Sequence, residues 1–407
     1  MTAFDFTPLL ADDLPAASGK WGGYPTHNFV GGHGDRETIP VEALIAAVTK
    51  QLTEKGQELA TYNLEGGPQG MLQLREFVAR KMTKDRGTPT TPDQVLITSG
   101  SLQGLDLVNG TLLNRGDTVI IEENTYGGML SKVARFGVKV VGAPLDGDGI
   151  DVVKLEAILD DLKSQGVIPK YIYTIPTIQN PTGSVMPLKR RHALLDLAKS
   201  RSIPIFEDEC YADLTWDGDW PAALRGLDDT GSVIHVGSFS KTLAPALRLG
   251  YMVADWPILS QMMALKSDAG TGAVEQMMVA EYFGNHFAEH LEMLKPRLKR
   301  KLDVMIEAVE REFGTAAEFT RPKGGIFFWM RIPGVDTTAL APAATAEGLH
   351  YNPGAEWSTM GANAQDCLRL CFALTTEDEI NAGVAKLAEI FRRETGIPAR
   401  SGNVDHG

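Results

Sequence analysis

The chain has 407 residues, 43% of them hydrophobic and 22% charged, which is ordinary for a globular protein with room for two or three domains. Its net charge of −13, from 39 basic and 52 acidic side chains, argues against a general nucleic-acid or anionic-membrane surface. The three sparse cysteines, the absence of a secretory pattern at the N-terminus and the absence of any apolar run near ~20 residues predict a cytoplasmic protein without disulfides or a membrane span.

The N-terminal part of the chain begins as an arm and then becomes helical. The arm covers about the first 35 residues, is rich in Gly, Pro and Asp, and includes Gly31 and Gly32 near its end. Apolar residues then recur at helical spacing over 40–59. A turn-rich loop over 62–70 leads into a second predicted helix over 72–84.

Strand and helix patterns alternate from residue 92 onward. β-branched and apolar runs predict strands over 94–98, 118–122, 138–144, 171–175, 203–207 and 232–236. Helical patterns lie between most of them, for example over 151–163 and 188–200. This alternation predicts the α/β class, with a doubly wound, mostly parallel sheet. A last strand over 249–254 brings the sheet to seven strands and is close enough in sequence to pair antiparallel.

The C-terminal part has a different pattern. A helical pattern runs from 256 to about 313, which is longer than one ordinary helix and predicts a bend or break near Gly284 or Pro296. Strand patterns over 324–329 and 368–372 then indicate a second, smaller α+β domain. We therefore expect three parts, in chain order an arm with part of the small domain, a large domain, and the rest of the small domain: 1–55, 56–290 and 291–407.

Lys241 lies just past the predicted strand over 232–236. An amine at that place faces the crevice in which open α/β sheets bind ligands. Ser238 and Ser240 precede it closely, and Arg248 follows seven positions on. One ammonium, two hydroxyls and one guanidinium suit a phosphate-bearing aldehyde held as a Schiff base, which is how pyridoxal phosphate is carried.

Three other polar positions follow predicted strands. The segment 99–104 precedes a helix, so its backbone N–H groups make either an anion site suited to a phosphate or a simple helix cap. Asn180 begins an Asn-Pro-Thr-Gly turn, whose amide either bonds a ring oxygen of a cofactor or has no role beyond the turn. Asp208 ends a strand-like run and either pairs with a protonated pyridine nitrogen or is a solvated loop residue.

Arg369 and Tyr126 are also candidates for a binding site. Arg369 lies inside an apolar run, where a charge must either point to solvent or pair with an anion. Its guanidinium matches a substrate α-carboxylate in bidentate fashion. Tyr126 opens a predicted helix, so its ring either stacks on a flat ligand or belongs to the core.

The segment 286–290 matches the H-x-x-E-H pattern of some zinc proteases. No third ligand is evident, and the surrounding helix is charged and amphipathic. We therefore interpret His286 and His290 as part of a solvated helix face and expect no metal in this protein.

The motifs occur in a telling order: Ser-Gly-Ser, Tyr, Asn-Pro-Thr-Gly, Asp-x-x-Tyr, Ser-x-Ser-Lys and two arginines. Together they resemble the fold-type I pyridoxal-phosphate-dependent aminotransferases of classes I and II. The resemblance is strongest to the branch of 2-aminoadipate and kynurenine aminotransferases and of the catalytic domains of MocR-type regulators. It covers about residues 20 to 395, and its most specific parts are 176–183 and 238–250.

This resemblance implies catalytic roles for three residues. Lys241 would carry the cofactor covalently and shuttle the proton, Asp208 would bind the pyridine nitrogen, and Tyr126 would stack on the ring. Other residues would complete the cofactor site: Gly100, Ser101, Leu102, Asn180, Tyr211, Ser238, Ser240 and Arg248. Tyr62 would reach the phosphate of a neighbouring subunit, which implies a homodimer with active sites at the interface.

The resemblance also implies the substrates. Arg369 would bind the substrate carboxylate, with Asn180 and the glycine pair at Gly31 and Gly32 close by. An L-amino acid with an acidic, aromatic or larger apolar side chain would give its amino group to a 2-oxo acid such as 2-oxoglutarate. The arm over 21–33 and the loop over 351–354 would recognise the side chain.

The sequence departs from the family pattern in two places and leaves other activities open. Asn124 stands where relatives usually have proline, and Leu102 replaces a common glutamine, which weakens any transfer of substrate preference. A lyase, decarboxylase or oxidase on the same scaffold is the main alternative. A ligand-sensing transcription regulator is less favoured, because only about forty residues precede the first core helix.

Overall fold

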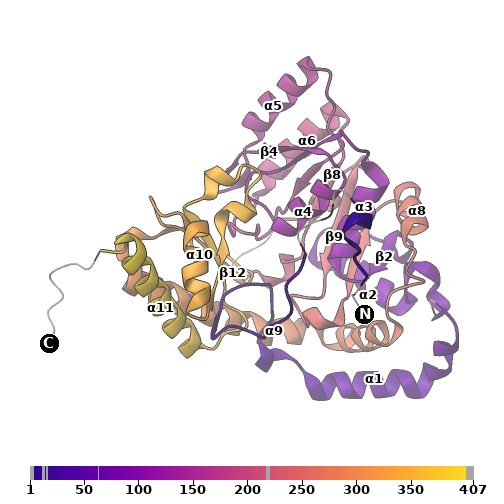
Figure 1. Cartoon of the computed structure of the whole chain (residues 1–407). Helices are drawn as coiled ribbons and strands as arrows, with labels where there is room; N and C mark the ends of the chain where they lie inside the picture. Colours follow the sequence, from indigo (N-terminus) through magenta and orange to yellow (C-terminus); the bar gives the residue numbers. More distant parts are fainter. Residues whose placement is uncertain (1–3, 12–13, 15–16, 63, 217–220, 400–407) are drawn as a thin grey trace.

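A seven-stranded sheet forms the centre of the larger part of the molecule, as seen in the computed structural model (Figure 1). The structure describes residues 4–11, 14, 17–62, 64–216 and 221–399. The strands follow the order β2 (Val95–Thr98), β10 (Gly250–Val253), β9 (Val233–Ser238), β8 (Ile205–Asp208), β7 (Ile172–Thr174), β3 (Thr118–Glu122) and β4 (Lys139–Ala143). β10 runs antiparallel to both neighbours and the other pairs are parallel, so the predicted mostly parallel sheet is confirmed.

Helices cover both faces of this sheet, which is why its central strands are buried along their whole length. On one face, α3 (Ser101–Leu112), α4 (Gly127–Arg135) and α8 (Trp256–Leu265) pack against residues such as Phe206 of β8. On the other face, α5 (Val152–Ser164) and α6 (Leu188–Arg201) pack against the neighbouring Ile205. The same face is extended by α1 (Val41–Lys55), α2 (Leu72–Asp85) and the first part of α9 (Ala273–Phe313).

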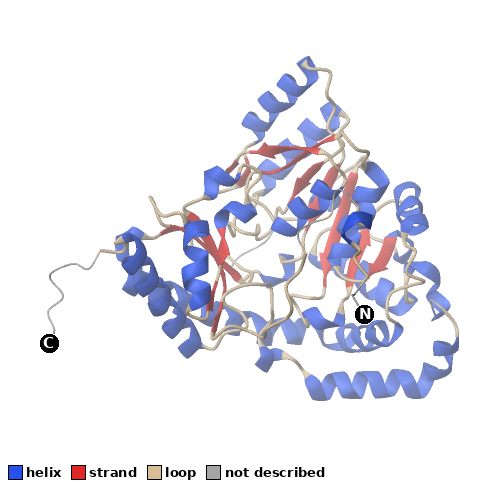
Figure 2. Ribbon diagram, viewed as in Figure 1, coloured by secondary structure: helices blue, strands red, loops and turns tan. Residues whose placement is uncertain are grey.

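A second, four-stranded antiparallel sheet forms the smaller part of the molecule (Figure 2). Its order is β11 (Glu318–Phe319), β12 (Phe327–Arg331), β15 (Cys367–Cys371) and β14 (Asn352–Pro353). Its core is completed by α10 (Thr337–Ala346), α11 (Glu377–Thr395) and the later part of α9. The arm joins this region, because β1 (His27–Asn28) pairs with β13 (Leu349–His350). Among the described residues, the remaining strands are β5 (Leu145–Asp146) and β6 (Gly149–Ile150), the remaining α-helix is α7 (Leu224–Leu227), and short 3₁₀ turns occur in the connections.

The sequence predicted a bend or break near Gly284 or Pro296. The long helical region is instead interrupted over 266–272, between α8 and α9. This segment is polar, and Ala269 and Gly270 have positive φ angles of 57° and 109°, which ends the helical path. α9 then continues through Pro296, because Leu294 and Leu298 on either side are buried in the core and their packing outweighs the missing hydrogen bond. The expected domain division at 290 and 291 therefore falls inside one continuous helix.

Glu122, at the carboxyl end of β3, is fully buried and ties this strand to the segment after β7. Its Oε1 accepts hydrogen bonds from the Thr174 hydroxyl at 2.6 Å and the Ile175 N–H at 3.1 Å. Its Oε2 accepts from the side-chain amide of Gln179 at 2.9 Å. Burial raises the pKa of Glu122 to about 7, although the three donors favour the ionised form.

We expect Glu122→Gln to change how the stability of the protein depends on pH. The unfolded glutamate titrates near 4.5 and the folded one near 7, so the stabilising contribution of Glu122 is present below pH 4.5 and is lost as the pH rises through 7. The free energy of unfolding of the wild type minus that of the variant should therefore fall by about 3 kcal/mol over this range, at about 1.4 kcal/mol per pKa unit. Urea denaturation at a series of pH values measures it, and a constant difference would contradict the raised pKa.

Candidate active site

A cavity of about 280 Å³ lies at the carboxyl ends of the parallel strands, where the large sheet meets the smaller region. Most of the residues predicted from the motifs line it: Gly31, Gly32, Ser101, Leu102, Tyr126, Asn180, Asp208, Tyr211, Ser238, Ser240, Lys241, Arg248 and Arg369. They come from segments up to 338 residues apart, as the contact between Gly31 and Arg369 shows. The fold thus brings the predicted candidates together in one place.

Lys241 lies in the turn after β9 and reaches into the cavity. Its Nζ donates a hydrogen bond to the carbonyl oxygen of Gly32 at 2.6 Å. A Cβ atom at position 32 would lie 2.5 Å from this Nζ, so a larger residue there would force the amine to move. Burial lowers the pKa of Lys241, and the positive charges of Arg369 and Arg248 lower it further, which favours the neutral, nucleophilic amine.

Asp208 presents a buried carboxylate to the same cavity from the end of β8. Its Oδ2 accepts a hydrogen bond from the Tyr173 hydroxyl at 2.7 Å, and its Oδ1 accepts from the backbone N–H of Cys210 at 3.1 Å. Burial raises the pKa of Asp208, and no ion pair between described residues includes it. A buried carboxylate that faces a cavity without a cationic partner fits a ligand with a protonated ring nitrogen.

The residues at one end of the cavity suit a phosphate. α3 begins at Ser101, so its free N–H groups point toward this end, and the hydroxyls of Ser238 and Ser240 line it as well. Arg248 has a left-handed backbone with φ of 53°, and its guanidinium donates to the Pro245 carbonyl at 3.0 Å. No ion pair of the described chain neutralises Arg248, so its charge is free for an anion.

Gly100 does not line the cavity but makes room for it. It has a positive φ of 79° just before α3, a conformation that favours glycine. A Cβ atom at this position would collide with the guanidinium of Arg248. Gly100 therefore lets the arginine lie against the helix N-terminus, beside Ser101.

Arg369 is a buried guanidinium on β15, between the rings of Phe327 and Trp357. Its Cζ lies 3.8 Å from the Phe327 ring centre and 3.6 Å from the Trp357 ring centre. It donates hydrogen bonds only to neutral oxygens: Gly31 O at 2.9 Å, Asn352 Oδ1 at 2.7 Å and Asn180 Oδ1 at 3.1 Å. Its Nε has no partner, and burial lowers its pKa to about 10. A guanidinium in this state fits an incoming carboxylate.

Asn180, Tyr211 and Tyr126 complete the walls. The Asn180 amide donates to the Tyr211 hydroxyl at 3.4 Å, so these two side chains lie side by side. Burial raises the pKa of both tyrosines, which are therefore neutral hydroxyl groups. Tyr126 precedes α4 and packs against Trp357, with ring centres 5.9 Å apart.

The sequence analysis gave no individual role to six residues of the cavity wall: Ile175, Cys210, Pro245, Phe327, Asn352 and Trp357. Cys210 stands between two predicted site residues in the sequence, and Asn352 belongs to the loop expected to recognise the side chain, so both had a local signal. Phe327 and Trp357 had none, because only the folded chain brings them to Arg369.

Tyr62 does not reach the cavity of its own chain. It lies between α1 and α2 and is 83% exposed. This exposure leaves its ring free at the surface.

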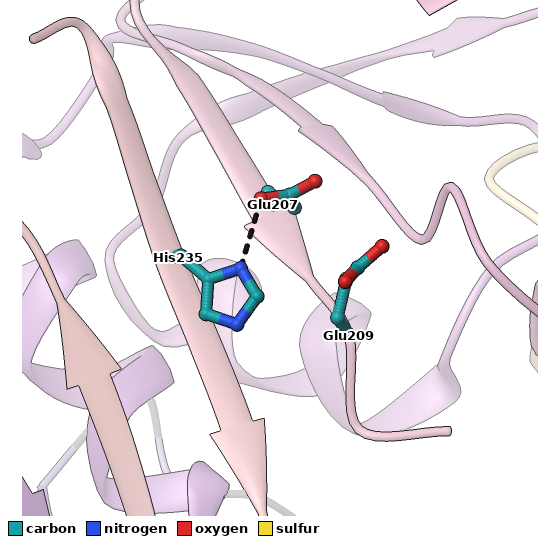
Figure 3. Close-up of side chains that lie close together, drawn as sticks. All are labelled: Glu207, Glu209 and His235. Atoms are coloured by element: carbon teal, nitrogen blue, oxygen red, sulfur yellow. Dashed lines mark hydrogen bonds and ion pairs between the residues drawn. The ribbon is translucent and has the colours of Figure 1, made fainter. Parts of the chain in front are cut away.

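A separate buried cluster joins Glu207, Glu209 and His235 (Figure 3). His235 and Glu207 face each other across β9 and β8, with Nδ1 and Oε2 2.8 Å apart. Backbone N–H groups of the α7 region occupy the oxygens of Glu207, and Arg86 lies 2.6 Å from Glu209 with Arg191 at 3.4 Å. The guanidinium groups would repel a cation at Glu209, so we assign this cluster to structure.

The sequence predicted that His286 and His290 of the H-x-x-E-H segment both belong to a solvated helix face, but only His286 does. His286 is half-exposed and pairs with Glu289 at 3.0 Å. His290 is buried, because α9 turns this residue toward the large domain. Its two ring nitrogens contact the Tyr282 hydroxyl at 3.0 Å and the Thr242 carbonyl at 2.6 Å. Both nitrogens of His290 are thus engaged within the protein.

Comparison with known proteins places this chain in a family. The model of the family "Aminotransferase class I and II" matches residues 33–387. Aromatic-amino-acid aminotransferase 1 of Thermococcus litoralis is 33% identical over 371 residues, which are 90% of this chain and 88% of that protein.

Two solved structures are similar over most of their length. The kynurenine aminotransferase of Pyrococcus horikoshii superposes with a TM-score of 0.84 and 33% identity, covering 90% of this chain and 91% of that one. The α-aminoadipate aminotransferase of Thermus thermophilus, complexed with N-(5'-phosphopyridoxyl)-L-leucine, gives a TM-score of 0.82 and 32% identity, covering 90% and 92%. The buried carboxylate, the phosphate-type end and the amine of the cavity fit pyridoxal phosphate. The chain therefore belongs to the class I and II aminotransferases and is an aminotransferase that uses pyridoxal phosphate as its cofactor.

Proposed function

We propose that this enzyme moves an amino group from an L-amino acid to a 2-oxo acid such as 2-oxoglutarate, with Lys241 as the residue that carries the cofactor. The observation that carries the proposal is the position of the Lys241 amine in one cavity with a cation-free carboxylate, a free guanidinium for phosphate and a second guanidinium for carboxylate. When bound, pyridoxal phosphate supplies an aldehyde that accepts the amino group and a ring that withdraws electrons.

The proposed role of each residue near the cofactor ring follows from its chemistry. Lys241 has a lowered pKa, so its Nζ can take a proton from the substrate Cα and return it. Asp208 keeps the ring nitrogen protonated, and Tyr126 covers the ring from the large domain. The Asn180 amide and the Tyr211 hydroxyl, 3.4 Å apart, would both contact the ring oxygen.

The phosphate end and the substrate end hold their anions separately. Gly100, by its missing side chain, Ser101 and Leu102, through the start of α3, and Ser238, Ser240 and Arg248, through their side chains, hold the phosphate. Arg369 binds the substrate α-carboxylate, with Asn180 and Gly32 beside it. Because Arg248 binds the phosphate and Arg369 binds the carboxylate, the two guanidinium groups together fix the orientation of the bound substrate.

The substrate side chain meets an environment that is largely aromatic and apolar. Tyr126, Phe327, Trp357 and Ile175 line the cavity, and Asn352 adds one amide. Aromatic and larger apolar side chains suit this wall through packing. Acidic donors and 2-oxoglutarate belong to the proposed range as well, with the arm over 21–33 and the loop over 351–354 as the places where their second carboxylate is recognised.

We further propose a cytoplasmic homodimer with the domain divisions expected from the sequence. The exposed ring of Tyr62 is free to reach the phosphate of a second subunit, which would place the active sites at the interface. The three cysteines are free and buried, as suits a reducing compartment. Within the described ranges, no helix has the length and hydrophobicity needed to cross a membrane.

The rival activities share the cofactor and differ in the fate of the substrate. A lyase, decarboxylase or oxidase on this scaffold would form product without an amino acceptor. Steady formation of a 2-oxo acid that depends on added acceptor supports transamination. A panel of amino acids, followed by the change in cofactor absorption, identifies the donors.

We expect Lys241→Ala to abolish turnover, because no other amine lines the cavity within the described chain. The variant should also lose the visible absorption of the covalently held cofactor and the label that borohydride fixes to the wild-type chain. Lys266→Ala, which removes an amine paired with Asp268 outside the cavity, serves as the control and should keep turnover and label. Turnover and label retained in Lys241→Ala would overturn the assignment.

We expect Arg369→Met to lower kcat/KM for amino acids by about 100-fold, mainly through KM, because a charged hydrogen-bonded partner of the carboxylate is lost. Cofactor loading should stay near the wild-type level. Arg331→Met is the matched control, since Arg331 lies on the neighbouring strand but pairs with Asp366 at the surface. Steady-state kinetics of both variants test this, and an unchanged KM in Arg369→Met would exclude the role.

A further inference from the structure

Tyr173 is a buried hydroxyl that the proposed chemistry does not yet use. It lies on β7, has 0% exposure and is absent from the cavity wall. Its hydroxyl donates a hydrogen bond of 2.7 Å to Asp208 Oδ2. Burial raises the pKa of Tyr173 well above its ordinary value, so the hydroxyl keeps its proton and remains a donor.

The contacts of Asp208 give this hydrogen bond a specific importance. Oδ1 accepts from the backbone N–H of Cys210, which shares its strand end and moves with it. Tyr173 contacts Oδ2 from a different strand, whereas the thiol of Cys210, the other side-chain donor to this carboxylate, belongs to the same strand end as Asp208. The plane and charge of the carboxylate therefore depend on Tyr173.

Packing of the Tyr173 ring fixes the direction in which its hydroxyl points. Tyr173 pairs in register with Phe206 across β7 and β8, and the two rings meet edge to face with centres 5.4 Å apart. Because the hydroxyl sits at the end of this fixed ring, it restricts the rotation of the Asp208 side chain.

We propose that Tyr173 is a positioning residue, which keeps the Asp208 carboxylate ionised and aimed at the ring nitrogen of the cofactor. This inference rests on the proposed role of Asp208. Donation by the hydroxyl stabilises the negative charge and makes the carboxylate less basic, so that the proton shared with the ring stays on the nitrogen. Loss of the hydroxyl should weaken cofactor binding and slow proton transfer at the substrate Cα, without altering the hold of Arg369 on the α-carboxylate.

Tyr171 offers a matched control two residues earlier in the chain. It has the same 0% exposure, its ring also packs on Phe206, and its hydroxyl also donates a hydrogen bond of 2.7 Å, but to Asn109 Oδ1. Tyr171→Phe and Tyr173→Phe therefore remove the same group from the same core. They differ in the acceptor that loses its donor, which is Asp208 for Tyr173→Phe and Asn109 for Tyr171→Phe.

The experiment compares the two holoenzyme variants with the wild type. Tyr173→Phe should raise the dissociation constant of pyridoxal phosphate by about ten-fold and lower kcat by about ten-fold or more, with KM for the amino donor within about three-fold. Tyr171→Phe should leave these three quantities unchanged while lowering the unfolding midpoint as Tyr173→Phe does. Equal dissociation constants and equal kcat in both variants would overturn the positioning role, since the hydroxyl would then serve stability alone.

Asp208→Asn separates this inference from the proposed function. Loss of turnover in Asp208→Asn together with wild-type kinetics in Tyr173→Phe would reject the role of Tyr173 and keep that of Asp208. Wild-type cofactor affinity and turnover in Asp208→Asn would reject the proposed role of Asp208, on which the inference rests.

Discussion

The active site depends on charged groups that the protein buries without a counter-ion. Asp208 is 5% exposed and Arg369 is 2% exposed, yet each is satisfied only by neutral donors, acceptors and aromatic faces. Burying unpaired charge is costly, so these contacts hold the groups in place without neutralising them. Under the proposed function, a positive ring nitrogen would pair with Asp208 and a substrate carboxylate would pair with Arg369. The cost of burying these unpaired charges would thus be offset by the ion pairs that form when cofactor and substrate bind.

The groups proposed to bind the cofactor and those proposed to bind the substrate carboxylate come from different sheets. The parallel strands end at one edge of the large sheet, where Asp208 of β8 and Ser238 of β9 face the cavity beside the start of α3. The antiparallel sheet contributes Arg369 and Phe327 from two paired strands. In the proposed function, the groups assigned to the cofactor therefore lie on one sheet and those assigned to the substrate carboxylate lie on the other. α9 runs through both regions and joins their cores.

Sequence reasoning found residues that line the cavity where the signal was local. Lys241, Asp208 and Asn180 each follow a strand, and strand ends can be recognised from a few neighbouring residues. Arg369 was recognisable because a charge in an apolar run is conspicuous. The same reasoning could not find Trp357, because its contact with Arg369 joins a short 3₁₀ turn to a strand across the folded small region.

The helix break and His290 show how packing overrides local rules. Pro296 is a stronger helix breaker than any residue of 266–272, yet α9 continues through it, because Leu294 and Leu298 anchor both sides in the core. His290 lies on a helix whose composition favours solvent, but the neighbouring Tyr282 and the Thr242 carbonyl enclose it. Neither outcome can be read from a window of sequence.

The arm over the cavity has a consequence for ligand exchange. Two successive carbonyl oxygens, those of Gly31 and Gly32, accept hydrogen bonds from Arg369 and from Lys241. These are the nitrogen groups that the proposed function assigns to the substrate carboxylate and to the cofactor aldehyde. Under that assignment, the ligands and the arm compete for the same two side chains, and occupancy of the cavity is coupled to the freedom of the N-terminal segment.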